Sequence, residues 1–481
     1  MPAASASKES RPALRRFEQW FLKLLRPLHR PMVLFLSAGV VPTHASPALD
    51  TLTVDQVVAE WLSKTGAPSA SIAIVQDGRL TYAKAYGAAR LDPPVTSTVT
   101  SRYPIDSLSK EFTAAAILIL AEQGKLSLDD SLGKWFPGLA APAAVTLRQL
   151  LAHTSGIRDF WPQDFVTPEM TQPTTAAAIL DEWVRRPLDF EPGTEWQYSN
   201  TGYVAAAVVV EKVSGLPLFE FLRRHVFEPL HMAHVIEYSS TPLGKGDALG
   251  YTRYGLGPAV PAPKEGRGWL FGAAGLAMQA SDLALWDLAL INRSLLNAAW
   301  YQAEFAPTVL KDGRVRDYGL GLDVESLRGR LRIGHSGAGS GFLAENRVWP
   351  QDRSAIVVLT NNDWANPSDL STRIAYVVLT QAPEEKRARE VFRALQNGNL
   401  DRGLFSEDGN FYLTAPVLAD LRSSLSPLGP ARSIELESES RRGGMTTRHW
   451  KILCRGARLE AVERSHPDGE LDEFLITQKD D

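Results

Sequence analysis

The sequence predicts an α/β (α+β) fold, in which one antiparallel sheet is flanked by helices and an all-helical domain is inserted between its strands. Two observations predict it. Strand-like segments lie near both ends of residues 49–383, whereas the section from about 100 to 325 is rich in helical patterns and turn dipeptides. This order of strands, helices and strands again favours a single sheet that is built from both ends of the domain.

Composition agrees with a globular protein and excludes several other classes. The 481 residues are 44% hydrophobic and 22% charged, which argues against wholesale disorder, collagen-like repetition and a polytopic membrane protein. The formal net charge of −4 gives no basic footprint for nucleic acid, so no nucleic-acid partner is expected. The single cysteine, Cys454, excludes an internal disulfide and a zinc site made of cysteines.

The first 48 residues are predicted to be a signal or leader segment. Seven cations and two acids within residues 1–31 precede an apolar run of ten residues, 32–41. That run is too short to span a bilayer, which takes about 20 residues, and small residues follow it. The pattern predicts a signal peptide cleaved near Ala45 or Ala48, and an exported, periplasmic or extracellular protein with no transmembrane span in the mature chain. A translation start at Met32, a basic amphipathic helix on a membrane surface and a disordered tail stay open as alternatives.

The main domain, 49–383, is predicted to begin with a helix and a hairpin. Apolar residues at helical spacing predict a helix over Val54–Lys64. Strands are predicted over Ser71–Val75 and Leu80–Tyr86, because they flank Asp77-Gly78, a dipeptide typical of tight hairpin turns. After the helical middle section, strands are predicted over 331–333, 342–348 and 354–360, and a helix over 368–380.

A linker, Gln381–Lys386, is predicted to lead into a small C-terminal α+β module over 387–481. Turn residues separate its expected elements, and its sequence shows no catalytic cluster, so its role stays open. Its expected helices lie near 387–396 and 416–426, and its expected strands cover 433–440, 445–453, 459–463 and 471–476.

The strongest chemical signal is Ser107-Leu-Ser-Lys110, followed by the apolar stretch 112–121. A helix that is apolar on all sides is expected to be buried, so it would carry Ser107 into the interior. Residues three apart on a helix share one face, which would place Lys110 beside the Ser107 hydroxyl. A serine nucleophile needs an adjacent base, and a desolvated lysine can act as one. Alone, the four-residue pattern is also typical of a helix-capping serine and a solvated lysine.

Five blocks in order make the chain resemble the serine β-lactamase and penicillin-binding-protein superfamily, over roughly residues 50–380. The resemblance is closest to the branch that holds class C β-lactamases, DD-carboxypeptidases, D-aminopeptidases and related esterases. It implies a β-lactamase/transpeptidase-like fold. The blocks are 101–130 with the Ser-x-x-Lys element, Thr146–Gly156, Phe190–Gly202, Gly272–Asp282 and Arg332–Gly341.

The resemblance implies roles for Tyr198 and Asn200. Tyr198 would share general base and acid work with Lys110, and Asn200 would hydrogen-bond the substrate amide. Residues two apart in extended or loop geometry point the same way, so both side chains are expected in one cleft. Nearby lysine charge is expected to ease the loss of the phenol proton. A buried aromatic residue beside a turn asparagine is the structural alternative.

The third element of the resemblance is His335-Ser336-Gly337, at the end of a predicted strand. Gly337 is expected to let substrate lie along the strand edge, and the backbone N–H of Ala338 is implied to complete an oxyanion hole with that of Ser107. Class C β-lactamases usually have lysine where this chain has His335. Because a histidine is charged only part of the time near neutral pH, efficient β-lactam hydrolysis is less expected than carboxypeptidase, aminopeptidase or esterase activity.

The predicted function is therefore a serine hydrolase that acts through an acyl-enzyme on an amide or ester, such as a D-amino-acyl peptide, an ester or a β-lactam. Its substrate is a small molecule or a peptide, with cell-wall fragments among the candidates. Neither a cofactor nor a metal is expected, and His225, His231 and His234 are interpreted as surface or structural residues. Two alternatives remain: a non-hydrolytic penicillin or peptidoglycan receptor, and an α/β-hydrolase that uses Ser336 in a nucleophile elbow.

Overall fold

The computed structural model describes residues 49–137, 144–163, 165–327, 330–379 and 383–478. The predicted leader, with its cleavage positions at Ala45 and Ala48, lies outside these residues, as does the alternative start at Met32. Within the described ranges, no helix is both long enough and apolar enough to cross a bilayer.

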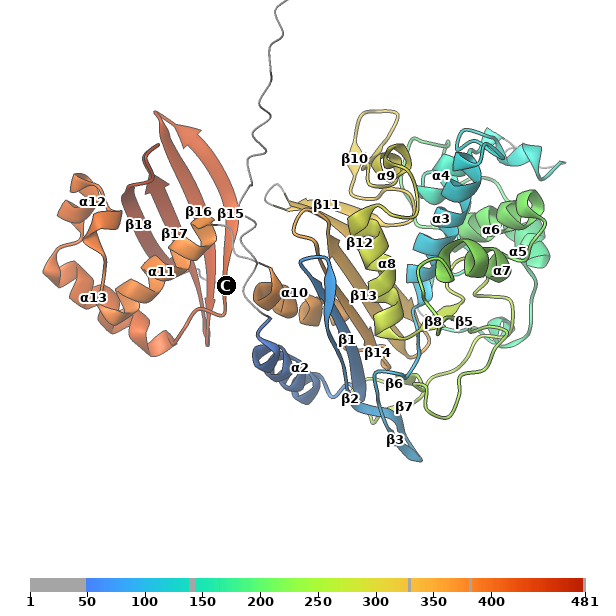
Figure 1. Ribbon diagram of the computed structural model, residues 1–481, viewed down its shortest axis with the longest axis horizontal. Coiled ribbons are helices and arrows are strands. Elements are labelled where there is room, and N and C mark those ends of the chain that lie inside the picture. Colours follow the sequence, from blue (N-terminus) through green and yellow to red (C-terminus); the bar gives the residue numbers. More distant parts are fainter. Residues whose placement is uncertain (1–48, 138–143, 164, 328–329, 380–382, 479–481) are drawn as a thin grey trace, which may run out of the picture. The chain divides into compact units, whose positions relative to one another are not determined.

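The main sheet has seven antiparallel strands in the order β11-β12-β13-β14-β1-β2-β3 (Figure 1). Strands from the two ends of the domain meet in its middle, where β14 pairs with β1. This arrangement confirms the prediction of one antiparallel sheet built from both ends. The strands are β1 (Ser69–Gln76), β2 (Arg79–Leu91), β3 (Pro94–Thr96), β11 (Asp323–Leu327), β12 (Arg330–Gly339), β13 (Phe342–Trp349) and β14 (Ser354–Thr360).

The predicted hairpin joins β1 and β2. Asp77 and Gly78 both have positive φ, 52° and 72°, as the favoured two-residue hairpin turn requires. The prediction of this turn is confirmed. Both strands extend beyond the ranges that the sequence predicts.

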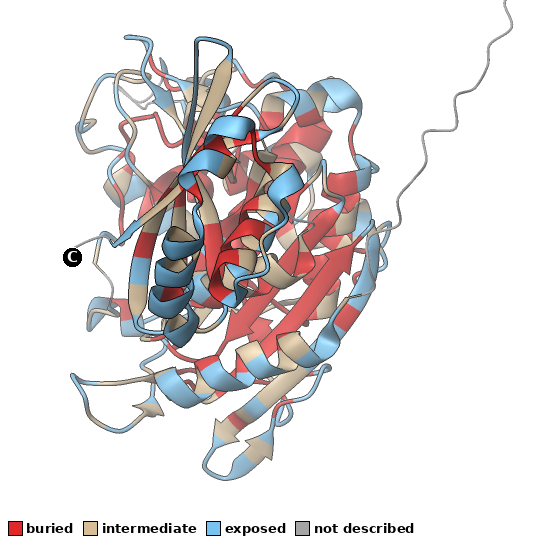
Figure 2. Cartoon of the chain, turned by 90° about the vertical axis from the view of Figure 1, so that its left-hand side faces the viewer, coloured by how far each residue is buried: buried red, intermediate tan, exposed pale blue. Residues whose placement is uncertain are grey.

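Helices cover both faces of the sheet (Figure 1). Alternating residues of β1 belong to two hydrophobic clusters: Ile72 and Ile74 pack with α2 (Thr51–Thr65) and α10 (Pro367–Val378), whereas Ala73 and Val75 belong to the larger cluster that includes α8 (Ala280–Asn292). Every residue of β1 is buried, and the central strands are red in Figure 2. Because side chains alternate along a strand, successive residues of β1 therefore pack into different hydrophobic clusters on the two faces of the sheet.

The section between β3 and β11 is mostly helical, as predicted, but it also contains short strands. These strands are two or three residues long, too short to show an alternating pattern in the sequence. The helices are α3 (Ser109–Glu122), α4 (Leu147–Leu151), α5 (Ala176–Trp183), α6 (Asn200–Ser214), α7 (Leu218–Leu222) and α9 (Ala298–Glu304); the strands are β4 (Tyr103–Pro104), β5 (Ile236–Glu237), β6 (Tyr251–Thr252), β7 (Val260–Pro261), β8 (Leu276–Met278), β9 (Thr308–Val309) and β10 (Val315–Arg316).

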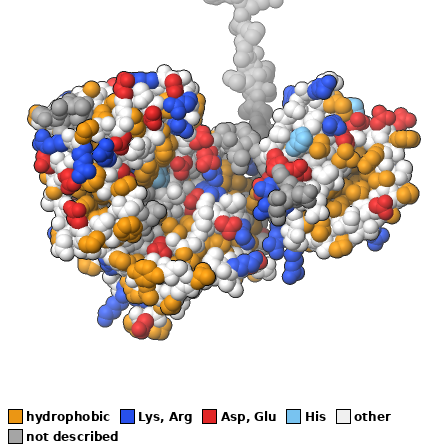
Figure 3. Space-filling view, turned by 180° about the vertical axis from the view of Figure 1, so that it is seen from behind, with side chains coloured by type: hydrophobic (Ala, Val, Ile, Leu, Met, Phe, Trp, Pro, Cys, Tyr) orange, Lys and Arg blue, Asp and Glu red, His pale blue; other side chains and the backbone are white. Residues whose placement is uncertain are grey.

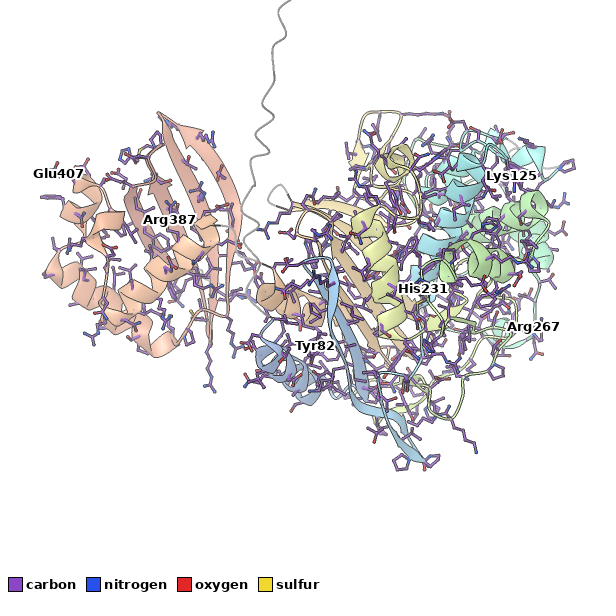
Figure 4. All side chains as sticks on the ribbon, viewed as in Figure 1. Tyr82, Lys125, His231, Arg267, Arg387 and Glu407 are labelled. Atoms are coloured by element: carbon purple, nitrogen blue, oxygen red, sulfur yellow. The ribbon has the colours of Figure 1, made fainter. Side chains whose placement is uncertain are left out.

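The C-terminal residues form a four-stranded antiparallel sheet with helices, in the order β15-β16-β17-β18. Arg387 (Figure 4) and Trp450 both donate hydrogen bonds to the fully buried Glu463 carboxylate, so that its charge is compensated inside this module. The elements are α11 (Pro383–Asn397), α12 (Glu407–Tyr412), α13 (Ala415–Leu425), β15 (Ser433–Arg442), β16 (Met445–Cys454), β17 (Ala457–Ser465) and β18 (Leu471–Gln478).

Two features of this module differ from the sequence prediction. The helix α11 begins at Pro383, so the last four residues of the predicted linker are helical. Proline suits the first turn of a helix because its missing N–H has no partner there. The short helix α12 was not predicted, because six residues are too few to show a helical period. The division of the chain between 383 and 387 stays a prediction.

Surface charge is mixed. On the face shown in Figure 3, Lys and Arg side chains alternate with Asp and Glu rather than gathering into one basic stripe. This distribution is consistent with the small net charge of the sequence.

Candidate active site

Ser107 and Lys110 lie next to each other at the start of α3. Ser107 is in a 3₁₀ turn, Asp106–Leu108, that leads directly into this helix. The Lys110 Nζ donates hydrogen bonds to Ser107 Oγ (3.1 Å) and to the Ala273 carbonyl (2.9 Å). The structure therefore brings together the two residues that the helical spacing predicts as neighbours.

Lys110 is fully buried, like every other residue of α3 from Ser109 to Ala121. This confirms the prediction of an interior helix. Burial lowers the pKa of Lys110 to about 7, although the charges of Asp159 and Asp106 act in the opposite direction. A substantial fraction of this amine is therefore uncharged near neutral pH and able to accept a proton.

Tyr198 lies in the loop before α6, beside both Ser107 and Lys110. Its phenol is close enough to Ser107 for the serine hydroxyl to act on its pKa, and its ring centroid lies 4.8 Å from Lys110 Nζ. The His153 ring packs against the Tyr198 ring, with 4.2 Å between centroids. Burial raises the pKa of Tyr198 above its ordinary value, so the expectation that nearby lysine charge eases loss of its proton is wrong. The phenol stays protonated at neutral pH and can donate.

Tyr198 and Ser199 lie in a loop, within the extended or loop geometry expected, but Asn200 is already the first residue of α6. Ser199 caps the helix, since its hydroxyl accepts the N–H of Gly202 at 3.2 Å. Asp159 accepts both the Asn200 backbone N–H (3.0 Å) and its side-chain amide Nδ2 (3.1 Å). These bonds orient the amide, and both Tyr198 and Asn200 still line one cleft.

The predicted third element lies on β12, where side chains alternate in direction. Ser336 and Ala338 are exposed to the cleft, whereas His335 and Gly337 are buried. A Cβ on Gly337 would lie 2.2 Å from the Ile105 carbonyl oxygen. Gly337 therefore lets the backbone before Ser107 approach β12, rather than leaving room for substrate as expected.

His335 is 5% exposed. Burial, with the nearby Lys110 charge, lowers its pKa to about 3. The expectation of a histidine that is charged part of the time near neutral pH is therefore wrong, because the sequence does not reveal this burial.

A cleft of about 1210 Å³ runs past these residues. It is large enough for a substrate of peptide or drug size. Lys110 and Gly337 are buried and do not line the cleft. Its lining includes Ser107, Asp159, Trp161, Phe165, Tyr198, Asn200, Arg253, Tyr254, His335, Ser336, Ala338, Ser340, Asp363 and Trp364.

Three residues at this site were not predicted: Asp159, His153 and Tyr318. Asp159 orients Asn200, and His153 accepts the Ser199 N–H at 3.1 Å while its ring packs on Tyr198. Tyr318 hydrogen-bonds His335 at 3.0 Å. His153 is part of the block Thr146–Gly156, for which the resemblance implies no site residue, and Asp159 and Tyr318 have no local sequence signal.

The α/β-hydrolase alternative is wrong. Ser336 lies within β12, which continues to Gly339 and turns into β13, whereas a nucleophile elbow needs a helix directly after the serine. His225 packs on the Phe221 ring, with 4.4 Å between centroids, and the His234 Nδ1 lies 3.4 Å from Asp282. His231 (Figure 4) has a left-handed backbone, φ 58°. Among the described residues, no three His, Cys, Asp or Glu side chains form a metal-binding group.

Comparison with known proteins gives one consistent answer. The chain is 29% identical to penicillin-binding protein 4* of Bacillus subtilis (strain 168) over 323 residues, which cover 64% of this chain and 71% of that protein. It is 33% identical to protein flp of Staphylococcus aureus (strain N315) over 241 residues, or 48% of this chain, and it spans 47% of that relative's length.

The fold is also similar to that of solved structures. The octameric penicillin-binding protein homologue from Pyrococcus abyssi superposes with a TM-score of 0.62 at 21% identity, covering 90% of this chain and 97% of that chain. The sequence profile of the family described as Beta-lactamase matches residues 54–381, which is more than half of the sequence. The chain belongs to the Beta-lactamase family.

Proposed function

We propose that this protein is a serine hydrolase that cleaves an amide or ester through an acyl-enzyme on Ser107. The observation that carries the proposal is the hydrogen bond of 3.1 Å between Lys110 and Ser107, made by a fully buried amine whose pKa is lowered to about 7. Such a lysine can take the proton of the serine hydroxyl without an external base.

Acylation would begin as uncharged Lys110 accepts the Ser107 proton and Oγ attacks the substrate carbonyl. Asn200, oriented by Asp159, would hydrogen-bond the substrate amide. The N–H groups of Ser107 and Ala338 would stabilise the oxyanion, and one such donor is typically worth about 10²–10³ in rate. The close approach of β12 to the Ser107 turn, permitted by Gly337, supports this arrangement.

Tyr198 would protonate the leaving group. The raised pKa of its phenol supports the role of donor, and Lys110, whose Nζ lies 4.8 Å from the centre of the Tyr198 ring, would then give Tyr198 the proton that it took from Ser107. Water would then release the acyl group, with Lys110 again as the base. In this scheme Lys110 is the base and Tyr198 the acid, a sharper division than the sequence implies.

The substrate would be a small molecule or a peptide, with cell-wall fragments among the candidates, reached after export of the protein. A receptor that is acylated once is the second candidate. Repeated product release from an ester distinguishes the enzyme from this receptor, which would form one stable adduct.

Labelling with a fluorophosphonate tests the nucleophile. The Ser107→Ala variant should lose covalent labelling completely, whereas Ser423→Ala, at an exposed serine on α13, should keep it. Circular dichroism would confirm that both variants are folded. Undiminished labelling of the folded Ser107→Ala variant would refute the proposal.

A further inference from the structure

The hydrogen bonds of His335 define its protonation state. Its Nδ1 lies against the Ser336 carbonyl oxygen, and its Nε2 lies 3.0 Å from the Tyr318 hydroxyl. Because a carbonyl oxygen can only accept, Nδ1 must carry the hydrogen. Because burial and the nearby Lys110 charge lower the pKa of His335 to about 3, Nε2 carries no hydrogen and accepts from the Tyr318 hydroxyl. The imidazole is uncharged, and neither of its nitrogens remains available to a ligand.

The surroundings of His335 oppose a second proton. The side chain is 5% exposed, and the Lys110 charge acts on it through the same interior. Its face toward the cleft is therefore that of a neutral, hydrogen-bonded ring. It cannot supply a cation to a substrate.

The other charges of the cleft are mostly negative. Among the described residues that line it, Asp159 and Asp363 are acids and Arg253 is the one lysine or arginine. The Arg253 guanidinium lies over the Trp364 ring at 4.1 Å and donates to the Gly66 carbonyl at 3.2 Å. Ser340, also in the lining, donates to the Glu265 carboxylate at 2.6 Å. Lys110 is charged only in the form that cannot take the Ser107 proton.

We propose that the cleft rejects a carboxylate in the leaving group of its substrate, and that this enzyme acts on esters and amides whose leaving groups are uncharged or cationic. This inference rests on the function proposed above and narrows its substrate class. A carboxylate in the leaving group would enter a cleft whose His335 is neutral, whose Arg253 is stacked on Trp364, and whose lining also holds Asp159 and Asp363. Penicillins and peptides with a free C-terminal carboxylate fall in the rejected class. His335, held by Tyr318, is the residue that determines this specificity.

A matched pair of esters tests the inference. Phenylacetyl esters of 3-hydroxybenzamide and 3-hydroxybenzoate differ only in an amide or a carboxylate of nearly equal size. For each ester, kcat/KM is divided by its rate of alkaline hydrolysis, which corrects for leaving-group reactivity. We expect the full-length protein to favour the uncharged ester by about tenfold or more. His335→Lys should shift this ratio toward the carboxylate by a similar factor, whereas His335→Gln, which stays neutral, should not.

Each outcome decides between two hypotheses. Equal rates for the two esters, or preference for the carboxylate, would overturn the inference while leaving the serine hydrolase intact. Arg253→Gln shows whether that guanidinium binds carboxylates: a selective loss of the carboxylate ester in this variant would also overturn the inference. If fluorophosphonate labels Ser107 but neither ester reacts, the inference fails, since a neutral site must accept the uncharged ester. If Ser107 is not labelled at all, the proposed function itself fails.

Discussion

Lys110, the base in the proposed mechanism, is a buried amine, and its titration predicts how activity depends on pH. Burial lowers its pKa to about 7, so protonated Lys110 accumulates below this value and cannot accept the Ser107 proton. We expect kcat/KM for an uncharged ester to rise with pH through about 7 and then to level off. Tyr198 adds no falling limb there, because burial raises its pKa.

Rates of acyl-enzyme formation between about pH 5 and pH 9 measure this profile. An ester without ionisable groups serves as the control, because its own charge does not change over the range. A flat profile, or one that falls as pH rises through 7, would contradict the role of Lys110 as the base.

The predictability of each site residue depends on how local its signal is. Ser107 and Lys110 are three residues apart on one helix, so the sequence spacing alone brings them together. Asp159 and Tyr318 meet their partners across 41 and 17 residues, and no local pattern reports such contacts. The same holds for electrostatics: the charge state of His335 depends on burial, which is a property of the whole fold.

At the scale of elements, length decided what the sequence could predict. The β1–β2 hairpin and α3 follow from a turn dipeptide and a long apolar stretch, whereas β4 and β8 are too short to have a period. The extended or loop geometry expected for Tyr198–Asn200 ends one residue early, because Ser199 caps α6 and Asn200 is the first helical residue. The role of Gly337 could not be predicted either, because its close contact is with the Ile105 carbonyl, far away in the sequence.

The interior of α3 carries a second ionisable group whose effect on stability can be measured. Glu111 is fully buried and accepts the Trp286 indole N–H at 2.6 Å, and burial raises its pKa from 4.5 to about 8. Between these two values the folded protein holds a proton that the unfolded chain has lost. This group therefore reduces the free energy of unfolding as pH rises from about 4.5 to about 8.

Glu111→Gln should remove this loss, because glutamine resembles the protonated acid. We expect the variant to unfold with nearly wild-type stability at about pH 4.5 and to be more stable than wild type at about pH 8. The gain is at most several kcal/mol, since a tenfold change in proton affinity corresponds to about 1.4 kcal/mol. Urea unfolding at both pH values measures it. Glu182→Gln, at an exposed position on α5, should follow the wild type, and a Glu111→Gln variant that does so too would contradict the argument.

At the scale of the whole molecule, the order of strands and helices along the chain was enough to predict one antiparallel sheet built from both ends of the domain, although not the order of its strands. Strands from both ends can join one antiparallel sheet only if they meet beside each other, as β1 and β14 do. What the C-terminal module does is a different question, because its sequence carries no chemical pattern. The family profile ends at residue 381, just before α11.

A chain that ends at residue 382 should therefore still fold and react. The two hydrophobic clusters of the main domain are built from residues before 380, and the module has a separate cluster around Phe392 and Trp450. We expect the shortened protein to unfold cooperatively and to label with fluorophosphonate at a rate within about threefold of the full chain, because Ser107, Lys110 and Tyr198 all lie in the retained part. The Ser107→Ala version of the shortened chain is the control for specific labelling. A folded shortened chain that no longer labels would instead assign the module a direct part in forming the active site.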